Sequence, residues 1–139
     1  MKKFVKSISY APKLDDVFSG KCRRTTRLLS VRLIPASKLC PTVGDEILFH
    51  EWTGRPYFSK WGRRIRVKVT DLSIMSITED DVVFINGMTV AEEDGEKLAR
   101  LDGIKPATSD EYMRVLKEKN GLDTLRNTTW AIIDWEVIA

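Results

Sequence analysis

The pattern of apolar and polar residues predicts strands at three places in the chain. The clearest alternation covers residues 64–70, whose odd-numbered positions are apolar and whose even-numbered positions are mostly basic. Residues 46–52 follow a Gly44-Asp45 turn signal and are also typical of a strand. Residues 130–138 are apolar over most of their length, so we expect this strand to lie in the middle of a sheet.

Apolar residues at helical spacing predict three helices. Pro12 opens the first helix, which ends at Gly20. The second covers residues 90–101 and carries an acidic exposed side. The third follows a capping box, in which the Thr108 hydroxyl is expected to accept a hydrogen bond from the amide of Glu111.

The rest of the chain carries weaker strand signals and loops. Short strands are expected within residues 4–10 and in the basic stretch 21–29. Residues 30–43 are expected to form an irregular loop with a strand fragment at 31–34. Residues 81–87 are expected to form a strand that ends in an Asn-Gly turn. The alternative is that residues 78–81 begin a short helix. These elements predict an α+β fold of five to seven strands and about three helices, built on a small barrel or strongly curved sheet.

The composition is that of one ordinary globular domain covering residues 1–139. Hydrophobic residues make up 42% and charged residues 31% of the chain, which excludes disordered, collagenous and fibrous classes. The longest apolar runs, at 82–85 and 130–133, have four residues, whereas a membrane span needs about 20. The first residues also lack the apolar segment of an export signal, so we expect a cytoplasmic protein without membrane contact.

The formal net charge of +3 hides an uneven distribution along the chain. Residues 1–68 hold 16 Lys and Arg against 5 Asp and Glu, a net +11, whereas residues 69–139 hold 7 against 15, a net −8. This asymmetry indicates either one face built for a polyanion or a solvated surface on which like charges cluster. The sequence also leaves open whether the acidic half contacts a protein partner.

Cysteine and histidine contents exclude several kinds of site. Cys22 and Cys40 lack a Cys-x-x-Cys spacing, and we expect both to be reduced. His50 is the only histidine of the sequence and lies in a predicted strand, which favours a packed or surface residue over a catalytic one. The sequence contains no Gly-x-Gly-x-x-Gly or P-loop pattern, so we expect no metal and no cofactor.

The basic stretch after Gly20 is a first candidate site. It contains Lys21, Arg23, Arg24 and Arg27 together with two threonines. These side chains supply many hydrogen-bond donors and suit a phosphate-binding surface. Charged residues also protect exposed edge strands from aggregation, which is the structural alternative.

The loop within residues 52–64 is a second candidate site. Aromatic and basic residues are interleaved in it. This composition is typical of sites where nucleic-acid bases stack on aromatic rings while Lys and Arg contact the nucleic-acid backbone. The nucleic-acid contacts expected in this loop are Arg55, Tyr57, Lys60, Trp61, Arg63 and Arg64. We expect Trp61 or Tyr57 to be exposed for binding, and we place Trp52 and Phe58 in the core. The alternative is that several of these rings only pack the loop against the protein.

Five segments are informative as an ordered set: Ser19–Arg27, Gly44–Phe49, Ile65–Val69, Leu101–Ile104 and Trp130–Trp135. In order and spacing, over roughly residues 8–138, they resemble an ASCH domain of the PUA-like superfamily. No single segment is specific, and the ordered combination carries the resemblance. It implies a PUA-like small mixed β-barrel with flanking helices, and a cleft that binds RNA or a nucleobase.

One branch of that family, the acetylcytidine amidohydrolases, hydrolyses the amide on the exocyclic nitrogen of cytosine with a Lys, a Thr and a Glu. The Lys, Thr and Arg of its Gly-x-Lys-x-x-Thr-x-Arg pattern fall here on Cys22, Thr25 and Arg27. Lys21 lies one residue before the lysine position, and Asp102 lies approximately at the glutamate position. The resemblance therefore implies Lys21 as base, Thr25 as nucleophile or water-positioning residue, and Asp102 as the partner that tunes the lysine. These roles require that Lys21 reaches the cleft.

Two main hypotheses about function follow, both with RNA or a nucleoside as the partner. The first is an RNA- or nucleotide-binding module, in which the cations of the basic half border one aromatic-lined cleft. The second is an amidohydrolase that acts on a modified nucleoside such as acetylcytidine through Lys21, Thr25 and Asp102. A ribonuclease, for which one histidine gives little support, and a protein-interaction role for the acidic helix are further alternatives.

Overall fold

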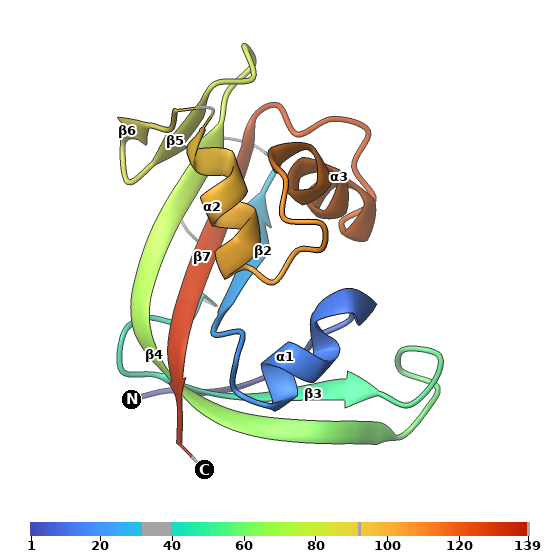
Figure 1. The fold of residues 1–139 in the computed structure, drawn as a ribbon. Coiled ribbons are helices and arrows are strands. Elements are labelled where there is room, and N and C mark those ends of the chain that lie inside the picture. Colours follow the sequence, from blue (N-terminus) through green and yellow to red (C-terminus); the bar gives the residue numbers. More distant parts are fainter. Residues whose placement is uncertain (32–39, 92, 139) are drawn as a thin grey trace.

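The computed structural model describes residues 1–31, 40–91 and 93–138, and seven strands within these ranges form one mixed sheet (Figure 1). The strands are β1 (Lys3–Ser7), β2 (Arg24–Ser30), β3 (Glu46–Trp52), β4 (Trp61–Ile77), β5 (Val83–Ile85), β6 (Met88–Thr89) and β7 (Thr128–Val137). A 3-10 turn, η1 (Ala11–Lys13), precedes helix α1 (Leu14–Phe18). Helices α2 (Asp94–Leu101) and α3 (Ser109–Lys119) lie together over one end of the sheet. No helix within the described ranges is long and apolar enough to cross a membrane.

The sheet curls into a half-barrel around the long strand β4 (Figure 1). Residues 61–68 of β4 pair with β3, and residues 75–77 pair with β5. β7 pairs with β4 along residues 67–77. β7 also pairs with β2, and β1 pairs with β3 in parallel. The curl brings β1 and β2 near each other. The Arg27 guanidinium of β2 donates a hydrogen bond to the carbonyl of Ser7 in β1.

Strand β7 lies in the middle of the sheet, as its apolar sequence predicted. Trp130 and Ile132 belong to the core that lies beneath α2 and α3. Ile133 and Trp135 belong to a second core, which includes residues of α1, β3 and the first half of β4. Because both faces of β7 are buried, its sequence shows an unbroken apolar run instead of an alternation.

Strand β4 is longer than the alternation at 64–70 predicted. Val67 and Val69 are buried, and the alternating Arg64, Arg66 and Lys68 are exposed, as expected. After a register shift between Val69 and Asp71, the strand continues to Met75 and Ile77, which pack in the core beneath α2 and α3. The strand therefore passes from one core to the other. For this reason the alternation of buried and exposed residues seen up to Thr70 does not continue to the end of the strand.

Turn and cap signals located several other elements. The Thr108 hydroxyl accepts a hydrogen bond from the Glu111 amide at 3.1 Å, which confirms the capping box of α3. Asn86 and Gly87 have φ values of 51° and 82°, as the predicted tight turn between β5 and β6 requires. Helix α2 begins at Asp94, later than expected. The strand fragment predicted at 31–34 falls almost entirely outside the described residues.

Candidate functional site

A small cavity lies between the end of β1 and strand β2, and we call it the β1–β2 cavity. Its volume is about 130 Å³. Helix α3 and the turn after α2 form its other walls, so residues far apart in the sequence meet there. Its apolar lining includes Ile8, Ile104, Val115 and Leu116. Its polar lining includes Lys13, Thr25, Thr26, Arg27, Asp102 and Asn120.

Lys13 reaches this cavity from the 3-10 turn η1 and is only 4% exposed. Its Nζ donates hydrogen bonds to Oδ1 of Asp102 at 2.8 Å and to the Asp102 carbonyl at 3.1 Å. Longer contacts, at 3.4 and 3.5 Å, join it to the carbonyl of Arg24 and to Oγ1 of Thr25. Asp102 is the C-cap of α2, so the ammonium also lies at the negative end of that helix. These contacts compensate a buried charge that would otherwise be costly.

The second carboxylate oxygen of Asp102 is held by two hydroxyl groups in series. Thr26 Oγ1 donates to Oδ2 of Asp102 at 2.6 Å, and the Tyr112 hydroxyl lies 2.8 Å from the same Thr26 oxygen. Because the Thr26 hydrogen is directed to the carboxylate, Tyr112 is the donor in the second bond. Burial raises the pKa of Tyr112, which keeps its phenol protonated for this role. We call Lys13, Thr25, Thr26, Asp102 and Tyr112 the Lys13–Asp102 cluster.

The structure brings Thr25 and Asp102 together but places Lys21 elsewhere. Lys21 is exposed and lines a separate hollow of about 400 Å³ with Arg23 and Arg24. The ammonium of the cluster comes from Lys13, a residue outside the motif that indicated Lys21. A salt bridge between Lys13 and Asp102 joins residues 89 positions apart, so no local pattern in the sequence signals it.

Cys22 packs beneath the cluster, at the position where the resembling pattern has its lysine. Its Sγ lies 3.8 Å from the carbonyl of Leu101, and burial raises the pKa of the thiol. Gly103 fits between Cys22 and Lys13 with a φ of +77°, and a Cβ there would lie 3.0 Å from both side chains. A side chain at position 103 would therefore collide with Lys13, which packs against Gly103 on its way into the β1–β2 cavity. Both cysteines are free and buried, as predicted.

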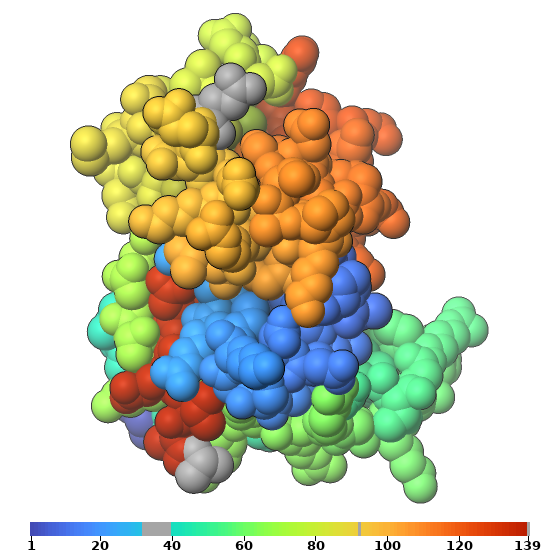
Figure 2. Space-filling view, viewed as in Figure 1, coloured from blue at the N-terminus to red at the C-terminus, as the bar shows by residue number. Residues whose placement is uncertain are grey.

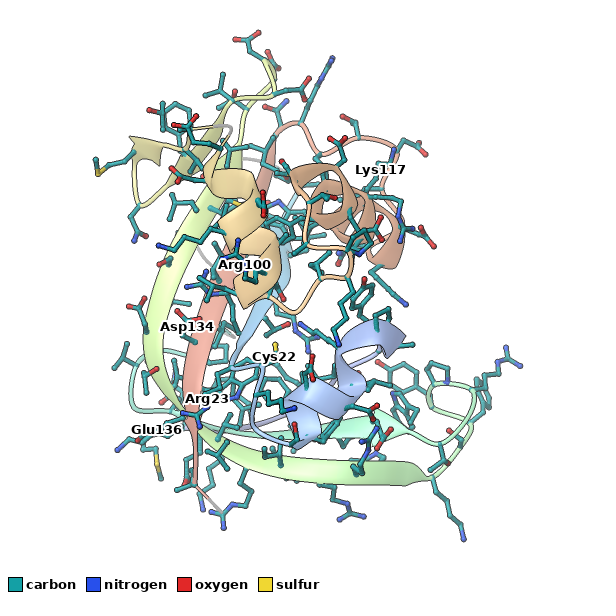
Figure 3. All side chains as sticks on the ribbon, viewed as in Figure 1. Cys22, Arg23, Arg100, Lys117, Asp134 and Glu136 are labelled. Carbon is teal, nitrogen blue, oxygen red and sulfur yellow. The ribbon has the colours of Figure 1, made fainter. Side chains whose placement is uncertain are left out.

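The remaining cations of β2 and its preceding turn point in different directions. Arg24 forms two hydrogen bonds with Asp134, at 2.6 and 2.9 Å, which raise the pKa of the guanidinium. Arg27 lines the β1–β2 cavity, and burial lowers its pKa. Figure 3 shows Arg23 and Arg100 on opposite sides of Asp134, on the face that carries the separate hollow. The cations of the basic half therefore do not border one cleft, in contrast to the expectation.

The loop between β3 and β4 forms the tip of a projecting hairpin, visible in green beyond the body of the molecule (Figure 2). Tyr57 is 83% exposed, as expected. Phe58 is 77% exposed, so its placement in the core was wrong. Trp52 and Trp61 are half-buried at the base of the tip, and Trp52 belongs to neither core, so its placement in the core was also wrong. Phe58 escapes burial because the tip extends past α1, which packs against the basal part of β4.

Aromatic rings at the base of the tip form a connected row. The buried His50 ring stacks on Trp61 at 4.0 Å between centroids, and it meets the Trp52 ring edge-on at 4.9 Å. Trp52 in turn lies 5.2 Å from Tyr57. Arg64 lies over the Trp61 ring at 5.0 Å. Histidine 50 is thus a packed residue, as its strand position predicted.

Some of the predicted cations of the loop contact other side chains of the protein, and others are exposed to solvent. Arg63 bonds Glu51 at 2.5 Å and Asp15 of α1 at 2.8 Å, and it lowers the pKa of Glu51. It therefore fastens the hairpin to α1. Arg55 lies over the Phe58 ring at 4.6 Å. Lys60 and Arg64 are exposed, so they remain accessible to a ligand.

Comparison with known proteins adds information about the fold. A crystal structure of an ASCH domain from Lactobacillus crispatus JV V101 superposes with a TM-score of 0.60 at 13% sequence identity, covering 98% of this chain and 79% of that chain. No protein-family model and no curated protein sequence matches this chain. The superposition shows that the chain has the α+β fold of an ASCH domain, as its ordered segments predicted. Within the described ranges, no three Cys, His, Asp or Glu side chains are grouped to hold a metal ion.

Proposed function

We propose that this protein binds RNA or a nucleotide and holds one nucleobase in the β1–β2 cavity. The observation that carries this proposal is the buried ion pair between Lys13 and Asp102, with the hydroxyls of Thr25 and Thr26 beside it. A buried ion pair is weak support for stability, because lost hydration offsets the attraction between the charges. We therefore assign the pair to ligand recognition, for which fixed donors and acceptors are needed along one wall.

The lining and the size of the cavity suit one flat heteroaromatic group. Its volume of about 130 Å³ is below the roughly 300–1,000 Å³ of sites for drug-sized ligands. Ile8, Ile104 and Leu116 offer apolar contact to the faces of a ring. The Lys13–Asp102 cluster and Asn120 offer hydrogen bonds to its edge. Unpaired bases are recognised in this way, through both a π-face and a polar edge.

Positive charge near the cavity favours a ligand that carries phosphate. Arg27 lines the cavity, and its Nε has no hydrogen-bond partner among the described residues. Lys119 also lines it and donates to the carbonyl of Ser9 at 3.4 Å. On the other side of Arg27, burial and the neighbouring guanidinium lower the pKa of Lys6. These cations supply the electrostatic attraction that phosphate binding requires.

A binding measurement with single-stranded RNA tests this proposal. If about four phosphates are contacted, affinity should fall by roughly two decades between 50 and 200 mM salt. Thr25→Val removes a hydroxyl at the cavity and should weaken binding about fivefold, the equivalent of one hydrogen bond of about 1 kcal/mol. Thr70→Val, at an exposed position of β4, is the matched control and should leave affinity unchanged. A salt-insensitive interaction, or equal affinity for both variants, would contradict the proposal.

A second candidate function is hydrolysis of an amide on a modified nucleoside, and the convergence of Lys13, Thr25 and Asp102 favours it. In this reaction the Thr25 hydroxyl, or a water held by it, attacks the acyl carbon and transfers its proton to the Asp102 carboxylate. The Lys13 ammonium stabilises the negative charge that develops on the acyl oxygen. The carbon–nitrogen bond then breaks, and the leaving amine takes up the proton. Where water attacks, acetate is released in this step; where Thr25 attacks, a water then hydrolyses the acyl-threonine ester, which releases acetate and restores the hydroxyl. Lys13 thus takes the place of Lys21 among the three residues, and Asp102 instead of the lysine is the base.

Chromatography of acetylcytidine incubated with the protein decides between binding alone and catalysis. The catalytic candidate predicts release of cytidine and acetate by the wild-type protein. It also predicts a loss of turnover in Thr25→Ala, while Thr70→Ala retains it. Absence of cytidine, or turnover that survives Thr25→Ala, rejects the assigned residues.

A further inference from the structure

The wall of the β1–β2 cavity is connected directly to the aromatic row at the base of the tip. The amide of Ile8, which lines the cavity, donates a hydrogen bond to the carbonyl of His50 at 2.9 Å. The His50 ring contacts Trp61 and Trp52, and Trp52 contacts Tyr57. A backbone hydrogen bond therefore joins the cavity wall to β3, the strand that carries His50 and Trp52, and the row of rings ends at the exposed Tyr57.

Hydrogen bonds give the tip a defined conformation before any ligand binds. The amide and hydroxyl of Thr53 both donate to the carbonyl of Lys60, at 3.0 and 2.8 Å. Ser59 Oγ accepts from the Gly54 amide at 3.1 Å and donates to the Arg55 carbonyl at 2.9 Å. A binding surface that is already ordered loses less conformational entropy on association.

Tyr57 is held in a backbone conformation that non-glycine residues rarely adopt. Its φ is +66°, in the left-handed region. This conformation directs a large ring into solvent at the end of the hairpin, where Phe58 is also exposed. Strained backbone conformations cluster at active sites and ligand-binding sites, and large exposed apolar patches mark interaction sites.

The charges around these two rings indicate the chemistry of their partner. Arg55, Lys60 and Arg64 are exposed in or beside the tip, whereas the carboxylate of Glu51 is already bonded by Arg63. Exposed rings between exposed cations favour an anionic strand with stacked bases over an uncharged apolar surface.

We propose that the ligand is a segment of single-stranded RNA that occupies both regions at once. One base lies in the β1–β2 cavity, and the same strand continues to the tip, where further bases stack on the exposed rings of Tyr57 and Phe58. Arg55, Lys60 and Arg64 contact the phosphates between them. This inference rests on the proposed function for the base in the cavity, and it makes a strand, not a free nucleoside, the preferred ligand.

Affinity measured against RNA length tests the inference. Fluorescence anisotropy gives the Kd of a labelled eight-nucleotide single strand, and competition against it gives the Kd of a mononucleotide. We expect the double variant Tyr57→Ser and Phe58→Ser to bind the eight-nucleotide strand at least about fivefold more weakly for each base that no longer stacks. Its affinity for the mononucleotide should equal that of the wild-type protein.

A matched control removes other exposed apolar side chains away from the tip. Met88 and Val43 are 75% and 63% exposed, and their replacement by serine should leave both affinities unchanged. Thermal unfolding of both double variants verifies that each is folded.

The two proposals fail in different ways. If the tip variant binds the eight-nucleotide strand as tightly as the wild type while Thr25→Val weakens both ligands, the stacking inference is overturned and the cavity assignment stands. If Thr25→Val changes neither affinity, the cavity assignment fails, and with it the two-region strand. Weakened strand binding by the tip variant, together with weakened binding of both ligands by Thr25→Val, supports both.

Discussion

At the β1–β2 cavity two charged side chains are buried, whereas at the tip of the β3–β4 hairpin two aromatic side chains are exposed to solvent. Lys13 and Asp102 are 4% and 3% exposed, and Tyr57 and Phe58 are 83% and 77% exposed. Both arrangements run against the usual preference of these residue types. They differ in what holds them: long-range contacts position the cavity, and local hydrogen bonds position the tip. Substitutions in the cavity should therefore alter folding and binding, and those in the tip binding alone.

The largest effect is expected from Asp102→Ala. The substitution leaves the Lys13 ammonium buried without its carboxylate, and breaking a buried ion pair in this way costs about 3–5 kcal/mol. Urea unfolding measures the loss directly. The double variant Lys13→Met with Asp102→Leu replaces both charges by apolar groups and should regain most of the stability. A single variant as stable as the wild type would mean that the pair is not buried as described.

An intermediate effect is expected from Thr26→Val. The substitution removes the hydroxyl between Tyr112 and Asp102, so two buried polar groups lose a partner. Asp102 still accepts from Lys13, so the main loss is the unsatisfied Tyr112 hydroxyl, which costs about 1–3 kcal/mol. Thr26→Ser should restore the bond and most of the stability. Equal unfolding free energies for the valine and serine variants would contradict the hydroxyl series.

A smaller effect, with a defined pH dependence, is expected at the base of the tip. Hydrogen bonds from Arg63 lower the pKa of Glu51 below its ordinary value of 4.5. The pair therefore contributes stability above that value, and the contribution is lost as the pH falls through the pKa of the folded state. Glu51→Gln should be less stable than the wild type at pH 7, and the difference should shrink toward pH 3. A difference that is the same at both pH values would show that the charge of Glu51 is irrelevant.

The smallest change in stability is expected from Tyr57→Ser with Phe58→Ser. Both side chains project into solvent, so their loss should alter the unfolding free energy by less than about 0.5 kcal/mol per site. Thermal unfolding at neutral pH checks this. A marked destabilisation would show that the rings pack against the protein and would end the contrast between the two regions.

The parts of the fold that local chemistry determines were predictable from the sequence. Strand β7 and the cap of α3 follow from apolar runs and from one hydroxyl, each within a few residues. The extension of β4 beyond residue 70 was not predictable, because it depends on a register shift where the strand passes between two cores.

The candidate site shows the same limit more sharply. Thr25 and Asp102 were identified through a resemblance to a motif, and the structure brings them close to a common lysine. That lysine is Lys13 because the end of α2 meets η1, a contact that joins distant parts of the chain. Phe58 was misplaced for a related reason: an aromatic residue in a loop is buried only if another element covers it, and the sequence does not reveal which element that is.

The most direct measurement is a titration of the 15N-labelled protein with an eight-nucleotide single-stranded RNA, followed by the amide chemical shifts. If one strand occupies both regions, saturable shifts appear together at Ile8, Thr25 and Thr26 around the cavity, and at Tyr57 and Phe58 in the tip, with one common Kd. Shifts confined to Arg23 and Arg100 in the separate hollow, or no saturable shift at low salt, would contradict the assignment of RNA binding to the cavity and the tip.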